Sequence, residues 1–232
     1  MQLFYVTGIS GGACILGDEE SHHCLKVLRM REGDTLHLTD GEGHIYEGAL
    51  TGMHPKGCLV TISSTKEVPP DPCPIHIAIA PTKNIDRFEW FLEKATEIGI
   101  SEITPLICEH SEREVVKLPR LEKVIVSAMK QSLKAWLPKL REPVRFRDLV
   151  VRQFPGGKFI AYCETGRESL LQKVCAACTQ TLVLIGPEGD FSPAEVSLAI
   201  QQGFTPVSLG PSRLRTETAG IVACHTLNLM RR

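Results

Sequence analysis

Five short runs of almost uninterrupted apolar residues follow one another in the later part of the chain, at 75–80, 103–107, 159–163, 181–186 and 206–210. Strands with so little alternation are typical of a parallel sheet that is buried on both faces. The segments between them carry apolar residues at helical spacing. This alternation of strands and helices predicts an α/β domain with helices covering the sheet.

Local signals place the ends of the predicted helices. The first is expected to begin at Asp86, with Glu89 completing a capping box, and to end at Gly99. The others are expected from near Pro119 to Trp136, from Ser192 to Gly203, and from about Thr218 onwards. The last of these is apolar on nearly every side, which predicts that it is buried.

The first 65 residues have a different pattern, with short alternating strands separated by turns and one helical stretch at 21–30. Several short strands in so few residues predict a small β-barrel. Four prolines at 69–74 then interrupt any helix or sheet, so the domain linker is placed there.

Charge and cysteine content narrow the function classes. The net charge is −1, yet residues 117–152 hold 10 basic and 3 acidic side chains. Such a segment is either a solvated face or a surface for an anionic partner. The nine cysteines follow no disulfide spacing, no apolar run reaches membrane length, and the first residues, MQLFYVTGIS, are not expected to form a signal peptide. These features predict free thiols in the cytoplasm.

Ligands of parallel sheets bind at the carboxyl ends of strands. Three unusual loops are expected there, at 163–166, 186–190 and 210–219. None of them matches a phosphate-binding glycine motif. Each loop alone is also compatible with a plain turn or a helix cap.

Taken together, the run LVLIGPEGDFSPAEVSLAIQQGFTPVSLGPSRLRTETAGIVA at 182–223 resembles the signature of the RsmE family. Further similar blocks lie at 80–99, 111–113, 131–132 and 22–34, so the resemblance covers nearly the whole chain. These SPOUT-superfamily enzymes methylate N3 of a uridine (position 1498) in 16S ribosomal RNA.

The resemblance implies a PUA-like RNA-binding barrel at 1–68, a linker at 69–74 and a SPOUT methyltransferase domain with a trefoil knot at 75–232. It also implies a homodimer and S-adenosylmethionine bound by the knot loops. The residues expected to hold this cofactor are Cys163, Glu164, Leu184, Ile185, Gly186, Pro187, Glu188, Gly189, Ser208, Leu209, Gly210, Leu214, Thr218 and Ala219.

Two polar residues are the candidates for the chemistry. Removing the N3 proton puts negative charge on the uracil oxygens, which the guanidinium of Arg215 is expected to stabilise. The proton acceptor is left open between Glu217, a residue of the partner chain and water. The alternative role for Arg215 is an ion pair with Glu217. The alternative role for Glu217 is to cap the start of the last helix or to interact with its dipole.

Recognition of RNA is assigned to basic residues, of which Lys123, Lys130 and Lys134 are expected to form one stripe on the second helix. The full set is Arg29, Arg31, Lys83, Arg87, Arg113, Lys123, Lys130 and Lys134. The partner is then 16S rRNA in the small ribosomal subunit. A SPOUT enzyme for another RNA and a non-catalytic assembly factor remain the alternatives.

The sequence departs from the family pattern at two places, where Asp190 and Lys134 replace an expected glycine and arginine. No metal site is expected, because the pair Cys175 and Cys178 has no second pair at zinc spacing.

Overall fold

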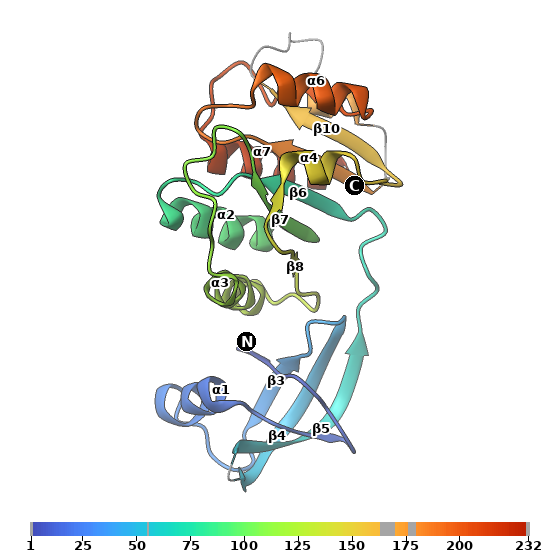
Figure 1. Cartoon of the computed structure of the whole chain (residues 1–232). Coiled ribbons are helices and arrows are strands. Elements are labelled where there is room, and N and C mark those ends of the chain that lie inside the picture. The colour runs from blue at the N-terminus through green and yellow to red at the C-terminus, as the bar shows by residue number, and fades with distance from the viewer. Residues whose placement is uncertain (1, 55, 163–169, 176–179, 231–232) are drawn as a thin grey trace. The chain divides into compact units, whose positions relative to one another are not determined.

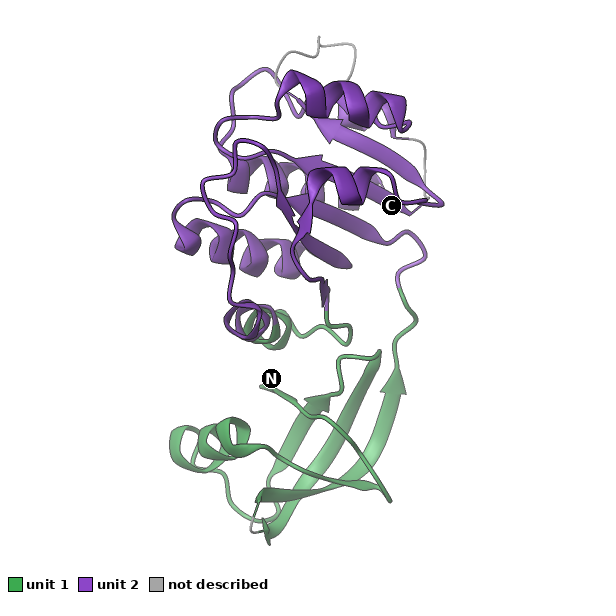
Figure 2. Cartoon of the chain, in the orientation of Figure 1, with its two compact units in different colours: residues 1–70, 126–137 green, residues 71–125, 138–232 purple. Residues whose placement is uncertain are grey.

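The computed structural model describes residues 2–54, 56–162, 170–175 and 180–230. The chain forms two compact units (Figure 2). The first contains residues 1–70 and 126–137, and the second contains 71–125 and 138–232. The chain therefore returns to the first unit after the linker, a feature that the linear domain boundaries expected from the sequence do not contain.

The first unit is built on a five-stranded sheet in the order β1-β3-β4-β5-β2. Its strands are β1 (Leu3–Tyr5), β2 (Ala13–Ile15), β3 (Thr35–Thr39), β4 (His44–His54) and β5 (Gly57–Glu67). A short helix α1 (Asp18–His22) runs directly into a π-helical turn η1 (His23–Val27). Alternating strand residues such as Leu36, Leu38, Leu50 and Val60 form the apolar core. The predicted small β-domain is confirmed.

The segment after α3 (Leu118–Gln131) adds to this unit through backbone hydrogen bonds. Gly43 N–H donates to Ala135 O at 2.9 Å, and Leu137 N–H donates to Gly41 O at 2.9 Å. The Trp136 indole N–H donates to Val68 O at 3.0 Å. These bonds fix the turn between β3 and β4.

The second unit contains a sheet in the order β12-β10-β11-β6-β7-β8, with β9 also paired to β7, and every pairing in it is parallel. Its strands are β6 (Ile75–Ile79), β7 (Glu102–Ile107), β8 (Lys139–Leu140), β9 (Val144–Arg145), β10 (Gly157–Ala161), β11 (Thr181–Ile185) and β12 (Thr205–Val207). From β6 the chain adds β7 and β8 on one side, then crosses to β10 on the other side, and β11 is inserted between β10 and β6. Ligands of such sheets bind at the carboxyl ends of strands where the strand order changes direction, which here is around β11.

Helices cover both faces of this sheet (Figure 1). On one side α2 (Ile85–Ile98) packs against α7 (Thr216–Met230), which also contacts β6 and β11. On the other side α4 (Phe146–Val150) packs against α6 (Pro193–Gln201). A short helix α5 (Leu171–Val174) contacts α7. The α/β fold expected from the sequence is confirmed.

Close packing of α7 depends on one missing side chain. A Cβ on Gly220 would lie 2.6 Å from Cε2 of Phe91 and 2.8 Å from Cδ1 of Ile79. Real Cβ atoms do not approach other atoms so closely, so the helix sits at this distance from α2 and β6 because position 220 is glycine. This contact places the first turns of α2 and α7 beside each other.

Several helix ends differ from the prediction. The N-cap of α2 is Asn84, whose side chain accepts from Asp86 N–H, so the expected capping box of Asp86 and Glu89 is wrong. The predicted capping box of α6 is confirmed, with Ser192 and Glu195 bonded reciprocally. α3 ends at Gln131, and Leu133 has a φ of 55°, so the chain leaves the helical path before Trp136.

The cysteine prediction is partly wrong. Cys14, Cys24, Cys58 and Cys108 are free thiols, but Cys73 is disulfide-bonded. Among the described residues no helix combines the length and the apolar character that crossing a membrane requires. The trefoil knot implied by the resemblance stays a prediction.

Candidate functional site

A pocket of about 820 Å³ lies where β10, β11 and β12 end. Its walls are the two loops that follow β11 and β12, together with the first turn of α7 and residues 161–162. The lining residues are Ala161, Tyr162, Ile185, Gly186, Pro187, Glu188, Asp190, Phe191, Val207, Ser208, Leu209, Gly210, Pro211, Ser212, Arg213, Leu214, Arg215, Thr216 and Ala219. This pocket, called here the loop pocket, combines apolar residues such as Ile185 and Leu209 with polar residues such as Ser208, a lining that suits a planar heterocycle with a ribose.

The loop after β11 is held from outside the pocket. Oε1 of Glu188 accepts a hydrogen bond from Lys83 N–H at 3.0 Å. Nδ1 of His110 lies 3.1 Å from the carbonyl oxygens of both Gly189 and Asp190. Gly189 itself does not line the pocket, and a Cβ there would meet Cβ of His110 at 3.1 Å.

Asp190 retains the backbone shape that glycine would adopt. Its φ is 62°, in the left-handed region, and its Oδ1 accepts from Phe191 N–H at 2.8 Å. Aspartate tolerates this region better than most residues because its short side chain bonds locally. Asp190 therefore adopts a backbone conformation that glycine would also allow at this position.

The loop after β12 is shaped by Ser208 and Gly210. The Ser208 hydroxyl donates to Gly210 O at 3.0 Å and accepts from Gly210 N–H at 3.2 Å. Gly210 has a φ of 139°, and among the described residues no atom beyond Gly210 and its two chain neighbours lies within 4 Å of where its Cβ would be. The Thr216 hydroxyl donates to Gly186 O at 3.1 Å, which joins the two loops.

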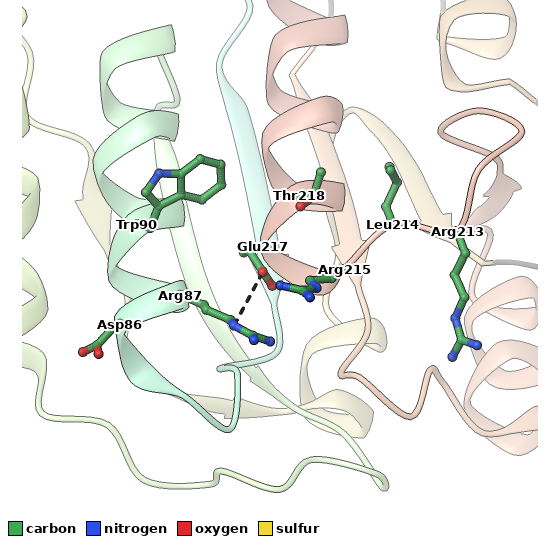
Figure 3. A pocket seen from close by; sticks show the side chains of 8 residues that line it. All are labelled: Asp86, Arg87, Trp90, Arg213, Leu214, Arg215, Glu217 and Thr218. Carbon is green, nitrogen blue, oxygen red and sulfur yellow. Dashed lines mark ion pairs between the residues drawn. The ribbon is translucent and has the colours of Figure 1, made fainter.

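A second pocket of about 600 Å³ lies between the first turns of α2 and α7 (Figure 3). It is called here the helix pocket, and its lining is Asp86, Arg87, Trp90, Arg213, Leu214, Arg215, Glu217 and Thr218. Residues 213–215 line both pockets, so the two cavities meet at this segment. Nε of Arg87 lies 3.9 Å from Oε1 of Glu217.

The structure brings most predicted cofactor residues together in the loop pocket, with three exceptions among the described residues. Leu184 is fully buried inside the sheet, Gly189 faces His110, and Thr218 lines the helix pocket instead. Cys163 and Glu164 lie outside the described residues. The two predicted catalytic residues, Arg215 and Glu217, both line the helix pocket.

Some predicted RNA-binding residues have partners within the protein. Lys130 is paired with Glu20. Arg113 donates to Thr82 O at 3.1 Å and to Lys83 O at 2.7 Å, which supports the loop after β6. These contacts give Lys130 and Arg113 a structural role whether or not they touch RNA.

The remaining predicted RNA contacts are placed as follows. Lys83 pairs with Glu112 at 2.7 Å, and this carboxylate raises the pKa of the Lys83 ammonium. Arg29, Arg31 and Lys123 are exposed. Because α3 ends at Gln131, the expectation that Lys134 continues one stripe of this helix is wrong.

Sequence reasoning missed the aromatic residues of both pockets. Tyr162 and Phe191 line the loop pocket, and Trp90 lines the helix pocket with 43% of its surface exposed. Trp90 follows Arg87 by three positions in α2. The sequence signal for the helix pocket was an indole three positions after an arginine, on the polar side of an amphipathic helix, where the two side chains are neighbours.

Comparison with known proteins agrees with this geometry. A family model described as an RNA methyltransferase domain matches residues 69–228, and one described as an RNA methyltransferase PUA domain matches 16–63. Among curated proteins, "Ribosomal RNA small subunit methyltransferase E" of Synechocystis is 32% identical over 90% of this chain and 70% of its own length.

Two solved structures share the fold over nearly the whole chain. A protein described as a probable rRNA-methyltransferase from Porphyromonas gingivalis is 45% identical, with 99% of both chains covered and a TM-score of 0.89. A methyltransferase from Legionella pneumophila, in complex with the bound cofactor SAM, is 31% identical, with 99% of this chain and 97% of that chain covered and a TM-score of 0.89. The chain therefore belongs to the ribosomal RNA small subunit methyltransferase E family, the RsmE family of the predicted resemblance.

Proposed function

We propose that this protein transfers a methyl group from S-adenosylmethionine to N3 of uridine 1498 in 16S rRNA. The observation that carries the proposal is the meeting of two pockets at residues 213–215. The loop pocket offers glycine-containing loops and apolar residues, the helix pocket offers the buried carboxylate of Glu217, and Arg215 lines both. A reaction between a cofactor and a base needs two such adjoining sites.

The loop pocket fits S-adenosylmethionine. Its volume of about 820 Å³ lies in the range of small-molecule sites. The missing side chain at Gly210 leaves open space beside the loop, and we assign the flanking of the adenine ring to apolar lining residues such as Ile185 and Leu209. When bound, the cofactor supplies a methyl group whose C–S bond breaks as the N3–C bond forms, and its sulfur leaves as a neutral thioether.

The residues of the helix pocket handle the charge and the proton. Loss of the N3 proton spreads negative charge over the two uracil oxygens, and we assign its stabilisation to Arg215, which lines this pocket. Glu217 is 6% exposed, and its Oε2 has no hydrogen-bond partner among the described residues. An acceptor in that state is suited to take the N3 proton, so we assign this role to Glu217.

We also propose that basic residues of the first unit contact the RNA. In addition, we propose that the enzyme is a homodimer. Arg29 and Arg31 are exposed in the first unit, which matches the PUA model, and suit contact with RNA phosphates. In α7 the apolar residues Ile221, Val222 and Met230 are only partly buried and Leu229 is 56% exposed, so this helix leaves an apolar surface that a second chain would cover. Light scattering is expected to give about twice 25.6 kDa. The substrate places the enzyme in the cytoplasm.

The test is methylation of unmodified small-subunit particles and of naked 16S rRNA, followed by mass mapping of the modified nucleotide. We expect one methyl group on N3 of uridine 1498, transferred faster to particles. Methylation of a ribose, of another RNA only, or of nothing would contradict the proposal. The first two outcomes favour a SPOUT enzyme with another substrate, and the third favours the assembly factor.

A further inference from the structure

The helix pocket presents three charged side chains on one opening. Figure 3 shows Arg87 from α2 and both Arg215 and Glu217 from the start of α7 directed into the same space. The Arg87 guanidinium and the Glu217 carboxylate are 3.9 Å apart, which is too long for a hydrogen bond. The attraction between the two groups is therefore a charge interaction that leaves their hydrogen-bonding capacity available.

Glu217 is the unusual member of this set. Its side chain is 8% exposed, and its Oε2 atom is buried without a hydrogen-bond partner in the part of the chain that the structure describes. A buried acceptor without a donor costs free energy. A ligand that brings an N–H group to this oxygen removes that cost, so the pocket selects for a ligand with a donor at this position.

The two arginines supply the complementary groups. Arg87 is 43% exposed at its side chain, Arg215 is exposed, and guanidinium groups only donate hydrogen bonds. With Glu217 as the acceptor, the opening offers two donor groups and one acceptor. The imide edge of uracil offers the complementary row, a carbonyl oxygen, the N3–H donor and a second carbonyl oxygen.

We propose that Arg87, Glu217 and Arg215 read the imide edge of the target base, so that the helix pocket distinguishes uracil from cytosine. Cytosine places an unprotonated N3 against Glu217 and an amino group against one arginine, so both contacts become unfavourable. This inference rests on the proposed function and deepens it. It assigns Arg87 to recognition of the base, whereas the sequence predicted Arg87 as one of the basic residues that contact the RNA.

Trp90 completes the pocket as an aromatic wall. In Figure 3 its indole extends from α2 toward α7, above the charged groups in this view, and it lines the same pocket. Enzymes that modify bases take the base out of its stack, read its Watson–Crick edge and hold its faces against aromatic side chains. An exposed indole next to a row of donors and an acceptor suits a base held in this way.

The experiment compares small-subunit particles that carry uridine or cytidine at the modified position. Rates are measured for the wild type, Arg87→Gln, Arg87→Lys and a matched control, Arg147→Gln, whose arginine is exposed on α4. We expect Arg87→Gln to lower kcat/KM for uridine by about 10- to 100-fold, the effect of one lost charged hydrogen bond. The preference for uridine over cytidine should shrink, and Arg87→Lys should recover part of the rate.

Cofactor affinity, measured by calorimetry, should be the same in all four proteins. If Arg87→Gln behaves like Arg147→Gln, or slows both substrates with the preference unchanged, Arg87 does not read the base. Loss of cofactor binding in Arg87→Gln would also overturn the assignment. If the wild type itself fails to methylate uridine, the proposed function fails, which is a distinct result.

Trp90 is tested separately. Trp90→Ala should raise KM for the particles by about 10-fold or more, and Trp90→Phe should retain most of the affinity, because stacking needs only an aromatic face. Light scattering is run on the same samples. A change in molecular mass in Trp90→Ala would show that the indole belongs to a contact between chains, which would contradict stacking on the base.

Discussion

The side chain of Glu188, in the loop after β11, accepts a hydrogen bond at 3.0 Å from the backbone N–H of Lys83, in the loop after β6. Two segments far apart in the sequence are thereby joined at the carboxyl edge of the sheet. Arg113 strengthens the same junction by donating to the carbonyl oxygens of Thr82 and Lys83. The conspicuous acid of the Gly186–Gly189 motif therefore shapes the wall of the loop pocket.

This relationship predicts how Glu188 variants behave. Glu188→Gln keeps an oxygen acceptor for Lys83 N–H, whereas Glu188→Ala removes it and frees the loop. We expect Glu188→Ala to weaken S-adenosylmethionine binding by about 5- to 10-fold, equivalent to roughly 1 kcal/mol for one hydrogen bond. Calorimetry with both variants checks this. Equal loss in Glu188→Gln would mean that the carboxylate charge contacts the cofactor directly.

The conformation of Asp190 predicts that replacing this residue lowers the free energy of unfolding. Its φ of 62° is unfavourable for alanine, and its Oδ1 bond to Phe191 N–H is lost in any variant without that oxygen. Asp190→Ala should lower the free energy of unfolding by about 1–2 kcal/mol. Asp190→Gly relieves the backbone and should cost less. Urea denaturation measures both, and a more stable Asp190→Ala variant would contradict this account of the loop.

The free energy of unfolding is predicted to depend on pH because the imidazole of His76 is buried. Burial lowers its pKa to about 4 from an ordinary value of 6.5, although Glu102 opposes the shift. Nε2 of His76 lies 2.8 Å from the Thr104 hydroxyl oxygen. Since the unfolded chain binds the proton first, stability contributed by neutral His76 is complete above pH 6.5 and is lost as the pH falls toward 4.

The full loss is on the order of 3 kcal/mol. Urea denaturation between these pH values should show the free energy of unfolding rising with pH, and His76→Gln should flatten that rise. The matched control is His54→Gln, at an exposed histidine, which should leave the slope in place. An unchanged slope in His76→Gln would exclude His76 as its source.

Exposed basic residues and ion-paired basic residues are predicted to affect different properties, RNA affinity in the first case and stability in the second. Arg29 and Arg31 are exposed, so Arg29→Ala and Arg31→Ala should each reduce the slope of log affinity against log salt for RNA by about 0.7–0.9. Lys130 pairs with Glu20 inside the first unit, so Lys130→Ala should lower stability with little change in that slope. Filter binding over a salt series, with thermal melting, checks the contrast. A slope change confined to Lys130→Ala would reverse these assignments.

The parts predicted correctly from the sequence are those set by local chemistry. The apolar runs of the sheet and the capping box of Ser192 and Glu195 depend on neighbouring residues, so a single sequence contains them. The end of α3 does not depend on neighbouring residues alone, because the segment at 132–137 leaves the helix and forms hydrogen bonds with the turn between β3 and β4. Contacts between distant segments decided that boundary.

The same distinction holds for the site. Gly186, Pro187 and Gly210 were predicted from motifs and line the loop pocket. Trp90 was not predicted, because its place beside Glu217 depends on the packing of α2 against α7, which Gly220 permits. The pattern of α2 showed an exposed aromatic residue without indicating what it would face.

Arg215 carries the central claim, because it lines both pockets and is assigned to the charge that develops on the base. The measurement is the single-turnover rate of methyl transfer at saturating RNA and cofactor in Arg215→Ala. We predict a rate lower by about 100-fold or more, the loss typical of an oxyanion donor, with partial recovery at higher pH as uracil ionises more readily. An unchanged single-turnover rate with only weaker RNA binding would contradict the proposed mechanism.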